Sequence, residues 1–338
     1  MKRTSHKGIA VAAGLLTIVT ALAISVDLSE WLRGGYGWRW PYEPLELVRV
    51  LPLIALVGVY IGGAYRLLRR PRRTGFALAW SIGGTLLIVL AAVAAREGDA
   101  WFALFARTAS NLGTGPHWVA SHIDWEGGAW RDWSAQMAFF GGHLSNLPPG
   151  SIMWYAGLSA LFDQLTPMSS AARAWLMPLQ CQNFDLLAYT PGQWASMLFG
   201  MAMPLWAALT PLALYAAARR IVPDSAQAVI LWYPLIPGLS GFAGTWNTVY
   251  PLLALLALLA ILIGCRDQRL KLGWIGLSGL ITGIGLFINF ALMPLPLLLG
   301  LFVLFNEVVI RRRMLARAIA IGVTFALGLA AVWIVFWL

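Results

Sequence analysis

Charged side chains are scarce in this sequence of 338 residues. Asp, Glu, Lys and Arg together make up 11% of it, whereas they approach a quarter of an ordinary globular chain. Hydrophobic residues make up 59%. So few charges cannot cover the surface of a water-soluble domain, and that class of protein is excluded.

Strict alternation of apolar and polar residues is also missing. The apolar residues fall in blocks of about 20, the helix length that crosses a hydrocarbon core roughly 30 Å thick. The blocks are rich in Leu, Ala, Ile and Gly. Without alternation a membrane β-barrel is disfavoured, and a helical bundle is the expected alternative.

Cysteine is rare, with only Cys181 and Cys265 present. They lie in different regions of the chain and show no metal-ligand spacing. We expect two free thiols.

The sequence therefore predicts an all-α, polytopic transmembrane helix bundle of about eight to ten spans. Residues 1–338 are expected to form a single integral membrane domain, with short interfacial helices in a long outer loop. The apolar run 152–165 is short, and it either crosses the membrane or is a re-entrant or interfacial segment. The other expected spans are 8–26, 47–67, 76–95, 195–218, 227–240, 249–264, 273–290, 292–305 and 318–338.

Acidic residues are fewer than basic ones, 14 against 24, for a net charge of +10. Most of the basic residues form short clusters beside apolar runs, as the positive-inside rule expects of cytoplasmic loops. We therefore expect contact with anionic membrane lipids and no nucleic-acid partner. The clusters are Lys2, Arg3 and Lys7; Arg66, Arg69, Arg70, Arg72 and Arg73; Arg219 and Arg220; Arg266, Arg269 and Lys271; Arg311, Arg312, Arg313 and Arg317.

The loops 27–46 and 96–151 are predicted to lie outside the cell. Segments 27–49 and 96–151 contain nine of the 14 acidic residues but only six of the basic ones. This asymmetry predicts a multi-pass protein of the plasma membrane with a cytoplasmic N-terminus.

The first outer loop offers one candidate site. Asp27 or Glu30 could act as a carboxylate base beside Arg33 and Arg39, and aromatic residues including Trp38 and Trp40 could form a platform for a sugar ring. The alternative is an aromatic belt at the membrane interface, which is a general feature of membrane proteins.

The second outer loop has more polar residues. His117, His122, Asp124 and Glu126 fall within ten residues, and imidazole and carboxylate groups can bind a divalent cation. They match no recognised ligand frame, so no metal ligand is assigned and the cofactor remains unknown.

The second outer loop ends on His143 and on Pro148-Pro149-Gly150, directly before an apolar run. Proline is well tolerated in the first turn of a helix, where its missing N–H would be unpaired anyway. Taken alone, this segment is an ordinary helix entry.

The order of these features resembles the GT-C superfamily, the multi-span glycosyltransferases that use polyprenyl-phosphate sugars. The branch concerned (family 39 type) contains the protein O-mannosyltransferases and the aminoarabinose transferases of lipid A. Leu147-Pro148-Pro149-Gly150 is similar to its His-Pro-Pro or Lys-Pro-Pro motif. Ala172-Arg173-Ala174-Trp175 looks like the Arg-containing turn that follows, and Glu97-Gly98-Asp99 stands where the family has an acidic pair. The resemblance covers residues 75 to 240.

The resemblance implies transfer of a sugar from a polyprenyl-phosphate donor to an acceptor at the outer membrane face. A carboxylate would take the acceptor proton while the lipid phosphate leaves through an oxocarbenium-like state. Asp99 is the expected base with Asp27 as the alternative, and Arg107 would hold the phosphate. Asp124, Glu126 and His143 would shape the acceptor side.

The competing hypothesis is a non-catalytic integral membrane subunit with a protein partner, or a transporter or lipid-handling protein. Ionisable residues are scarce within the spans, which argues against a transporter. A glycosyltransferase predicts an outer cavity lined by Asp27 or Asp99 with Arg107 and His143. A subunit predicts a broad apolar flank instead.

Overall fold

The computed structural model describes residues 3–35, 42, 44, 46–70, 73–111, 113–125, 127–140, 142–181, 183–266 and 268–337. The described residues are 82% helical and contain no strand. Several of its helices are long and apolar enough to cross a membrane. The predicted all-α membrane helix bundle is thereby confirmed.

Five helices in the described ranges pass this test of length and composition: Leu47–Leu68, Thr74–Glu97, Trp246–Gly264, Phe290–Ile310 and Leu315–Trp337. The count is six if α9 (Pro191–Met201) and α10 (Met203–Ile221), which meet at 42°, form one bent span. Two shorter apolar helices cover Val11–Ser25 and Leu272–Ile288. Only when all of these are counted is the lower end of the expected eight to ten spans reached.

The expected span 227–240 is not one helix. It is divided into α11 (Ala226–Trp232), a 3-10 turn η7 (Tyr233–Leu235) and the single-turn α12 (Gly238–Gly241). Pro234 and Pro237 lie at the breaks. Each lacks the N–H that a continuing helix needs, so the apolar run does not form a continuous span.

The chain divides into two compact units, Met1–Ile54 and Ala55–Leu338. The first contains α1 (Arg3–Ser25), a short 3-10 helix η1 (Glu30–Arg33) and the start of α2 (Leu47–Leu68). Large apolar side chains of α1, such as Leu16 and Val19, are exposed. This exposure suits a helix surrounded by lipid.

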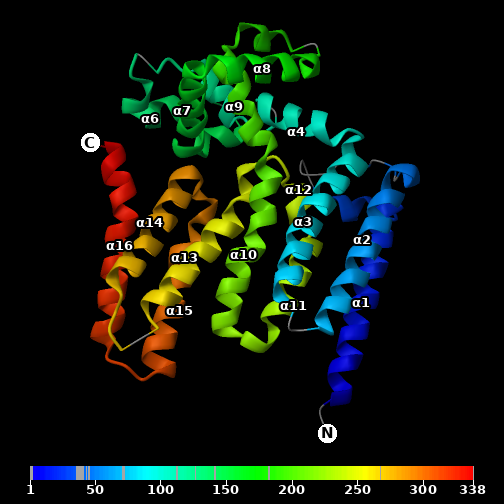
Figure 1. The fold of residues 1–338 in the computed structure, drawn as a ribbon, viewed down its shortest axis with the longest axis vertical. Helices are drawn as coiled ribbons and strands as arrows, with labels where there is room; N and C mark the ends of the chain where they lie inside the picture. The colour runs from blue at the N-terminus through cyan, green and yellow to red at the C-terminus, as the bar shows by residue number, and fades with distance from the viewer. Residues whose placement is uncertain are drawn as a thin grey trace. The chain divides into compact units, whose positions relative to one another are not determined.

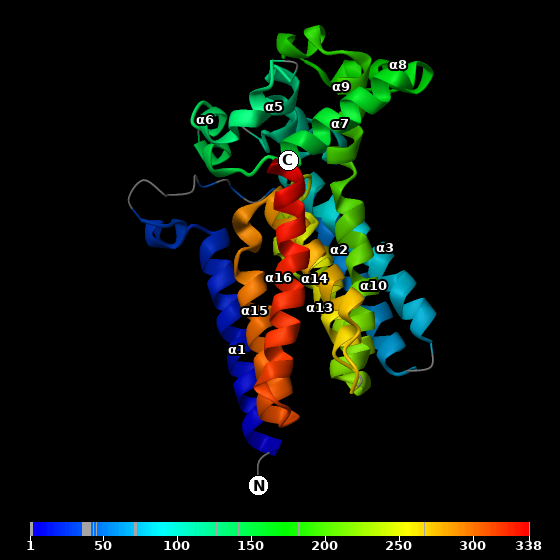
Figure 2. The same cartoon turned by 90° about the vertical axis from the view of Figure 1, so that its left-hand side faces the viewer.

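The second unit contains a bundle of long helices, seen in Figures 1 and 2. Glycines let α14 and α16 approach closely: a Cβ on Gly279 would lie 2.9 Å from the Leu329 amide nitrogen, and one on Gly328 would lie 3.0 Å from the Gly276 carbonyl carbon. Small residues at such contacts are typical of membrane helices. The bundle helices are α3 (Thr74–Glu97), α10, α13 (Tyr250–Gly264), α14 (Leu272–Ile288), α15 (Pro294–Leu304) and α16 (Leu315–Trp337).

A layer of shorter helices covers one end of this bundle, at the top of Figure 1. We call it the cap layer. It includes the short helices expected in the second outer loop, and also residues 152–165, which lie in the layer and not among the bundle helices. Its helices are α4 (Ala100–Ala109), α5 (Pro116–His122), α6 (Trp133–Met137), α7 (Gly150–Gln164), α8 (Thr166–Leu176) and α9.

The described residues of the second unit's basic clusters lie in or next to the turns between α2 and α3, α10 and α11, α13 and α14, and α15 and α16. These turns lie at the end of the bundle opposite the cap layer (Figures 1 and 2). The Gln227 side chain donates to the Leu67 carbonyl (2.9 Å), which joins α11 to the end of α2. Arg311 donates to the Cys265 carbonyl (2.7 Å), which joins the α15–α16 turn to the α13–α14 turn. Because α7 belongs to the cap layer, Arg219 and Arg220 end at the same side as the other clusters.

Candidate functional site

A pocket opens in the cap layer between α5, the turn that follows it, and α6. Its volume is about 380 Å³, within the roughly 300–1,000 Å³ usual for small-molecule sites. It combines aromatic walls with a carboxylate, an imidazole and an amide. The lining residues are Trp118, Val119, His122, Ile123, Asp124, Gly127, Gln136, Phe139 and Phe140.

The Asp124 carboxylate is exposed and is oriented by its own turn. Its Oδ1 accepts the Gly127 backbone N–H at 2.9 Å. A Cβ at position 127 would lie 2.9 Å from the Asp124 carboxyl carbon, so the tight turn needs glycine there. One backbone hydrogen bond leaves most of the lone-pair sites of a carboxylate available.

His122, on the last turn of α5, presents a ring nitrogen that can accept a proton. Its Nδ1 lies 2.7 Å from the Trp118 carbonyl oxygen. A carbonyl can only accept, so Nδ1 carries the hydrogen and the lone pair of the neutral ring is on Nε2. The ring is exposed and stacks on Trp118 with a centroid distance of 4.3 Å.

Aromatic side chains form the remaining walls. Phe139 is 84% exposed, and Phe140 packs against the buried Trp133 with ring centroids 5.5 Å apart. Gln136 on α6 adds an amide, which both donates and accepts hydrogen bonds. This combination can bind a ligand with an apolar face and hydroxyl groups on its edge.

His117 lies behind the pocket and is completely buried. Its Nε2 is 2.9 Å from the Gln193 carbonyl and 3.1 Å from the Ser196 hydroxyl, which ties α5 to α9. Burial lowers the pKa of His117 to about 4, opposed in part by the hydrogen bond to Gln193. Because Ser196 is also fully buried, the pair is an internal anchor and not a catalytic dyad open to substrate.

Asp99, the expected base, caps a helix. It is the N-cap of α4, and its Oδ1 accepts the backbone N–H groups of Trp101 (2.8 Å) and Phe102 (3.2 Å). This is a usual role of aspartate at a helix start. Asp99 does not line the cap-layer pocket.

Arg107, the expected phosphate ligand, is engaged inside the protein. Its guanidinium pairs with Glu97 and donates to the Ala243 carbonyl at 2.6 Å. Its side chain is only 15% exposed and it too is outside the pocket. Thus Glu97, and not Asp99, is the acid that the structure brings to Arg107.

In the first unit, Asp27 and Arg33 form an ion pair at 2.9 Å, with Glu30 3.8 Å from Arg33. Asp27 and Arg33, which the sequence analysis places together in one candidate site, are therefore in contact. The predicted site residues Trp38, Arg39, Trp40 and Glu126, and the His143 side chain, lie outside the described residues.

Pro148, Pro149 and Gly150 form the entry to α7. Pro149 is its N-cap residue. Gly150 is packed against the end of α14, where an added Cβ would lie 2.7 Å from a ring carbon of Phe287 and would overlap the Phe287 carbonyl. All three residues are buried, so the motif positions α7 in this structure.

Within the described ranges no group of three or more His, Cys, Asp and Glu residues lies close enough to hold a metal ion. The predicted cluster divides: His117 is internal, whereas His122 and Asp124 face the pocket.

The sequence analysis did not predict the aromatic walls of the pocket. The adjacent residues Phe139 and Phe140, near the end of the polar loop, could have indicated them. No family model, curated protein or solved structure matches this chain.

Proposed function

We propose that the chain is a membrane glycosyltransferase-like protein of GT-C type. It would transfer a sugar from a polyprenyl-phosphate donor to an acceptor at the outer face of the plasma membrane. The cap-layer pocket carries this proposal, because its aromatic walls and its Asp124, Gln136 and His122 side chains suit a sugar. Aromatic faces pack on the C–H faces of a sugar ring, while carboxylate and amide groups bond its hydroxyls.

In this proposal His122 and Asp124 serve the acceptor side of the reaction. The acceptor hydroxyl transfers its proton to the Nε2 of His122 or to the Asp124 carboxylate. The acceptor oxygen bonds to the anomeric carbon as the bond from that carbon to the phosphate oxygen breaks. The lipid phosphate leaves with the electron pair, through an oxocarbenium-like state.

The test is a transfer assay with polyprenyl-phosphate sugars, using the full chain in lipid. The substitution that removes the proton acceptor, either Asp124→Asn or His122→Gln, is expected to lower kcat/KM by about 100-fold or more, the usual contribution of a positioned acid or base. Asp185→Asn is the matched control, because Asp185 is an exposed carboxylate outside the pocket, on the 3-10 helix η5 (Phe184–Ala188) that connects α8 and α9 of the cap layer. If Asp124→Asn, His122→Gln and Asp185→Asn are equally active, the pocket does not take part in sugar transfer.

A second candidate is a non-catalytic integral membrane subunit, or a transporter or lipid-handling protein. The observation that favours it is the engagement of Asp99 and Arg107 in contacts that hold α4 in place. Absence of transfer by the wild-type chain with every donor, together with stable copurification of a membrane protein partner, would support this candidate over the first.

A further inference from the structure

A second pocket lies at the opposite end of the bundle from the cap layer. Its volume is about 570 Å³. It is formed where the end of α10, the α13–α14 turn and the α15–α16 turn meet. The lining residues are Tyr215, Ala216, Arg219, Arg220, Leu262, Arg266 and Arg311.

Four of the seven lining residues are arginines, and none is acidic. Arginine stays protonated in proteins, so the lining carries four positive charges. Like charges around one cavity repel each other unless an anion lies between them. The distribution of charge thus favours an anionic occupant.

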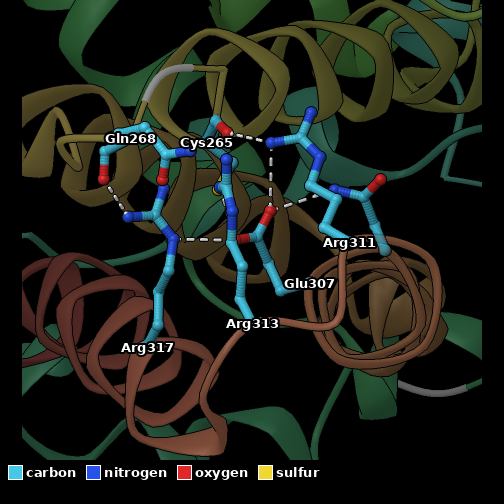
Figure 3. A network of polar contacts seen from close by, with 7 residues as sticks. Cys265, Gln268, Glu307, Arg311, Arg313 and Arg317 are labelled. Carbon is cyan, nitrogen blue, oxygen red and sulfur yellow. Dashed lines mark hydrogen bonds and ion pairs between the residues drawn. The ribbon is translucent and has the colours of Figure 1, made fainter.

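A buried acid, Glu307, contacts one of the lining arginines. Glu307 is completely buried and is engaged by Arg313 (2.9 Å), Arg317 (2.7 Å) and Arg311 (3.3 Å), as Figure 3 shows. Among the residues that line the pocket it contacts Arg311 alone. The charges of Arg219, Arg220 and Arg266 are not offset by it.

Contacts within the protein hold three of the guanidinium groups at the pocket. Arg311 donates to the Cys265 carbonyl at 2.7 Å in addition to its contact with Glu307 (Figure 3). Arg220 donates to the Ala216 carbonyl at 2.7 Å, and Arg219 lies 5.6 Å from the centre of the Tyr215 ring. A guanidinium has five N–H donors, so each of these groups retains donors for a ligand.

We propose that this pocket binds a phosphate group, carried either by an anionic lipid headgroup or by a soluble phosphate ester. The planar donor fork of arginine matches phosphate oxygens in pairs. Basic pockets between membrane helices bind phosphorylated lipid headgroups by this chemistry. Leu262, Ala216 and the Tyr215 ring add an apolar side, against which the carbon atoms of either ligand can pack.

The experiment uses the full chain in phosphatidylcholine nanodiscs and follows its thermal unfolding midpoint. One arm titrates cardiolipin into the nanodiscs, and the other titrates inorganic pyrophosphate into the solution. Each effective ligand raises the midpoint with its concentration, which yields an apparent Kd. A response to cardiolipin alone identifies a lipid headgroup, and a response to pyrophosphate, alone or in addition, identifies a site open to soluble phosphate.

The decisive comparison is between two double variants that remove equal charge from the same end of the bundle. Arg219→Gln with Arg266→Gln changes the pocket, and we expect its apparent Kd to rise at least about tenfold, since charged hydrogen bonds are lost. Arg269→Gln with Arg312→Gln changes exposed arginines outside the pocket, and we expect a change of less than about twofold.

Equal losses in the two double variants, or no response of the wild type in either arm, would overturn the proposal, because the arginines would then be a solvated basic surface. If the pocket double variant does not fold, Arg266→Lys replaces it. This variant keeps the charge but loses the planar fork, and a phosphate site predicts an apparent Kd above the wild-type value. The test is independent of sugar transfer, since it uses neither the donor nor the cap-layer pocket.

Discussion

Two histidines five residues apart on α5 have opposite environments. His117 is fully buried and bonded to α9, whereas His122 is exposed at the pocket. Burial disfavours the charged form of His117 and lowers its pKa from 6.5 to about 4. Residue type alone does not distinguish the two, because burial depends on what packs over each ring.

The low pKa of His117 predicts that stability depends on pH. Between about pH 6.5 and 4 the unfolded chain binds a proton at this position and the folded chain does not. The neutral His117 ring therefore makes its full contribution to the free energy of unfolding above pH 6.5. This contribution falls as the pH decreases towards 4, by about 3 kcal/mol for a shift of this size. The measurement is the unfolding midpoint in detergent as a function of pH.

The matched pair of variants for this prediction is His117→Gln and His122→Gln. The first removes the buried titrating ring and should flatten the pH dependence between 6.5 and 4. The second removes an exposed ring and should keep most of that dependence, because burial is the largest cause of the lowered His117 pKa. If His117→Gln keeps the wild-type pH dependence of the unfolding midpoint, that dependence must arise from another titrating group.

At the scale of elements, α7 illustrates how a helix is placed by its ends. Its apolar run is short for a span, which left two interpretations open in the sequence. In the structure its N-terminus packs on the end of α14, with Gly150 against Phe287. This contact holds α7 in the cap layer, so α7 is not an additional span of the bundle.

We expect Gly150→Ala to destabilise the protein by about 1–3 kcal/mol, the usual cost of overpacking. The added Cβ would overlap the Phe287 carbonyl, which is backbone and cannot move aside easily. Gly157→Ala, on the same helix with nothing within 4 Å of its Cβ, is the control. It should be neutral or stabilising by up to about 1 kcal/mol, because alanine favours helix. The free energies of unfolding of the two variants are compared by denaturant titration. Equal changes in both would contradict the contact between Gly150 and Phe287.

At the scale of the whole second unit, charge separates along the bundle. The cap layer contains Asp124, Asp163 and Asp185, and the other end carries the basic clusters (Figures 1 and 2). The positive-inside rule then predicts that the cap layer faces outward and the basic end faces the cytoplasm.

Native Cys181, exposed in the cap layer, can report this orientation. In intact cells a membrane-impermeant maleimide should label Cys181, whereas Cys265 is buried and should react poorly. Arg269→Cys in a Cys181→Ser background should be labelled only after the membrane is permeabilised. The reverse pattern would invert the orientation and place the arginine pocket outside.

The membrane class and the position of the basic clusters could be predicted from the sequence, because the length of an apolar run and the charges that flank it are local properties. Local information also identified Asp124 as a candidate. It did not distinguish Asp99 as a catalytic base from Asp99 as a helix cap, since aspartate serves both roles and the backbone of α4 decides between them.

The sequence by itself determined that this is a helical membrane protein with two kinds of connecting segment, acidic and basic. Tertiary structure alone decided the contact of Arg107 with the Ala243 carbonyl and the convergence of Arg219, Arg266 and Arg311 on one pocket. The physical reason is that pockets and buried pairs form between segments far apart in the chain. Their partners are set by helix packing, which leaves no local pattern.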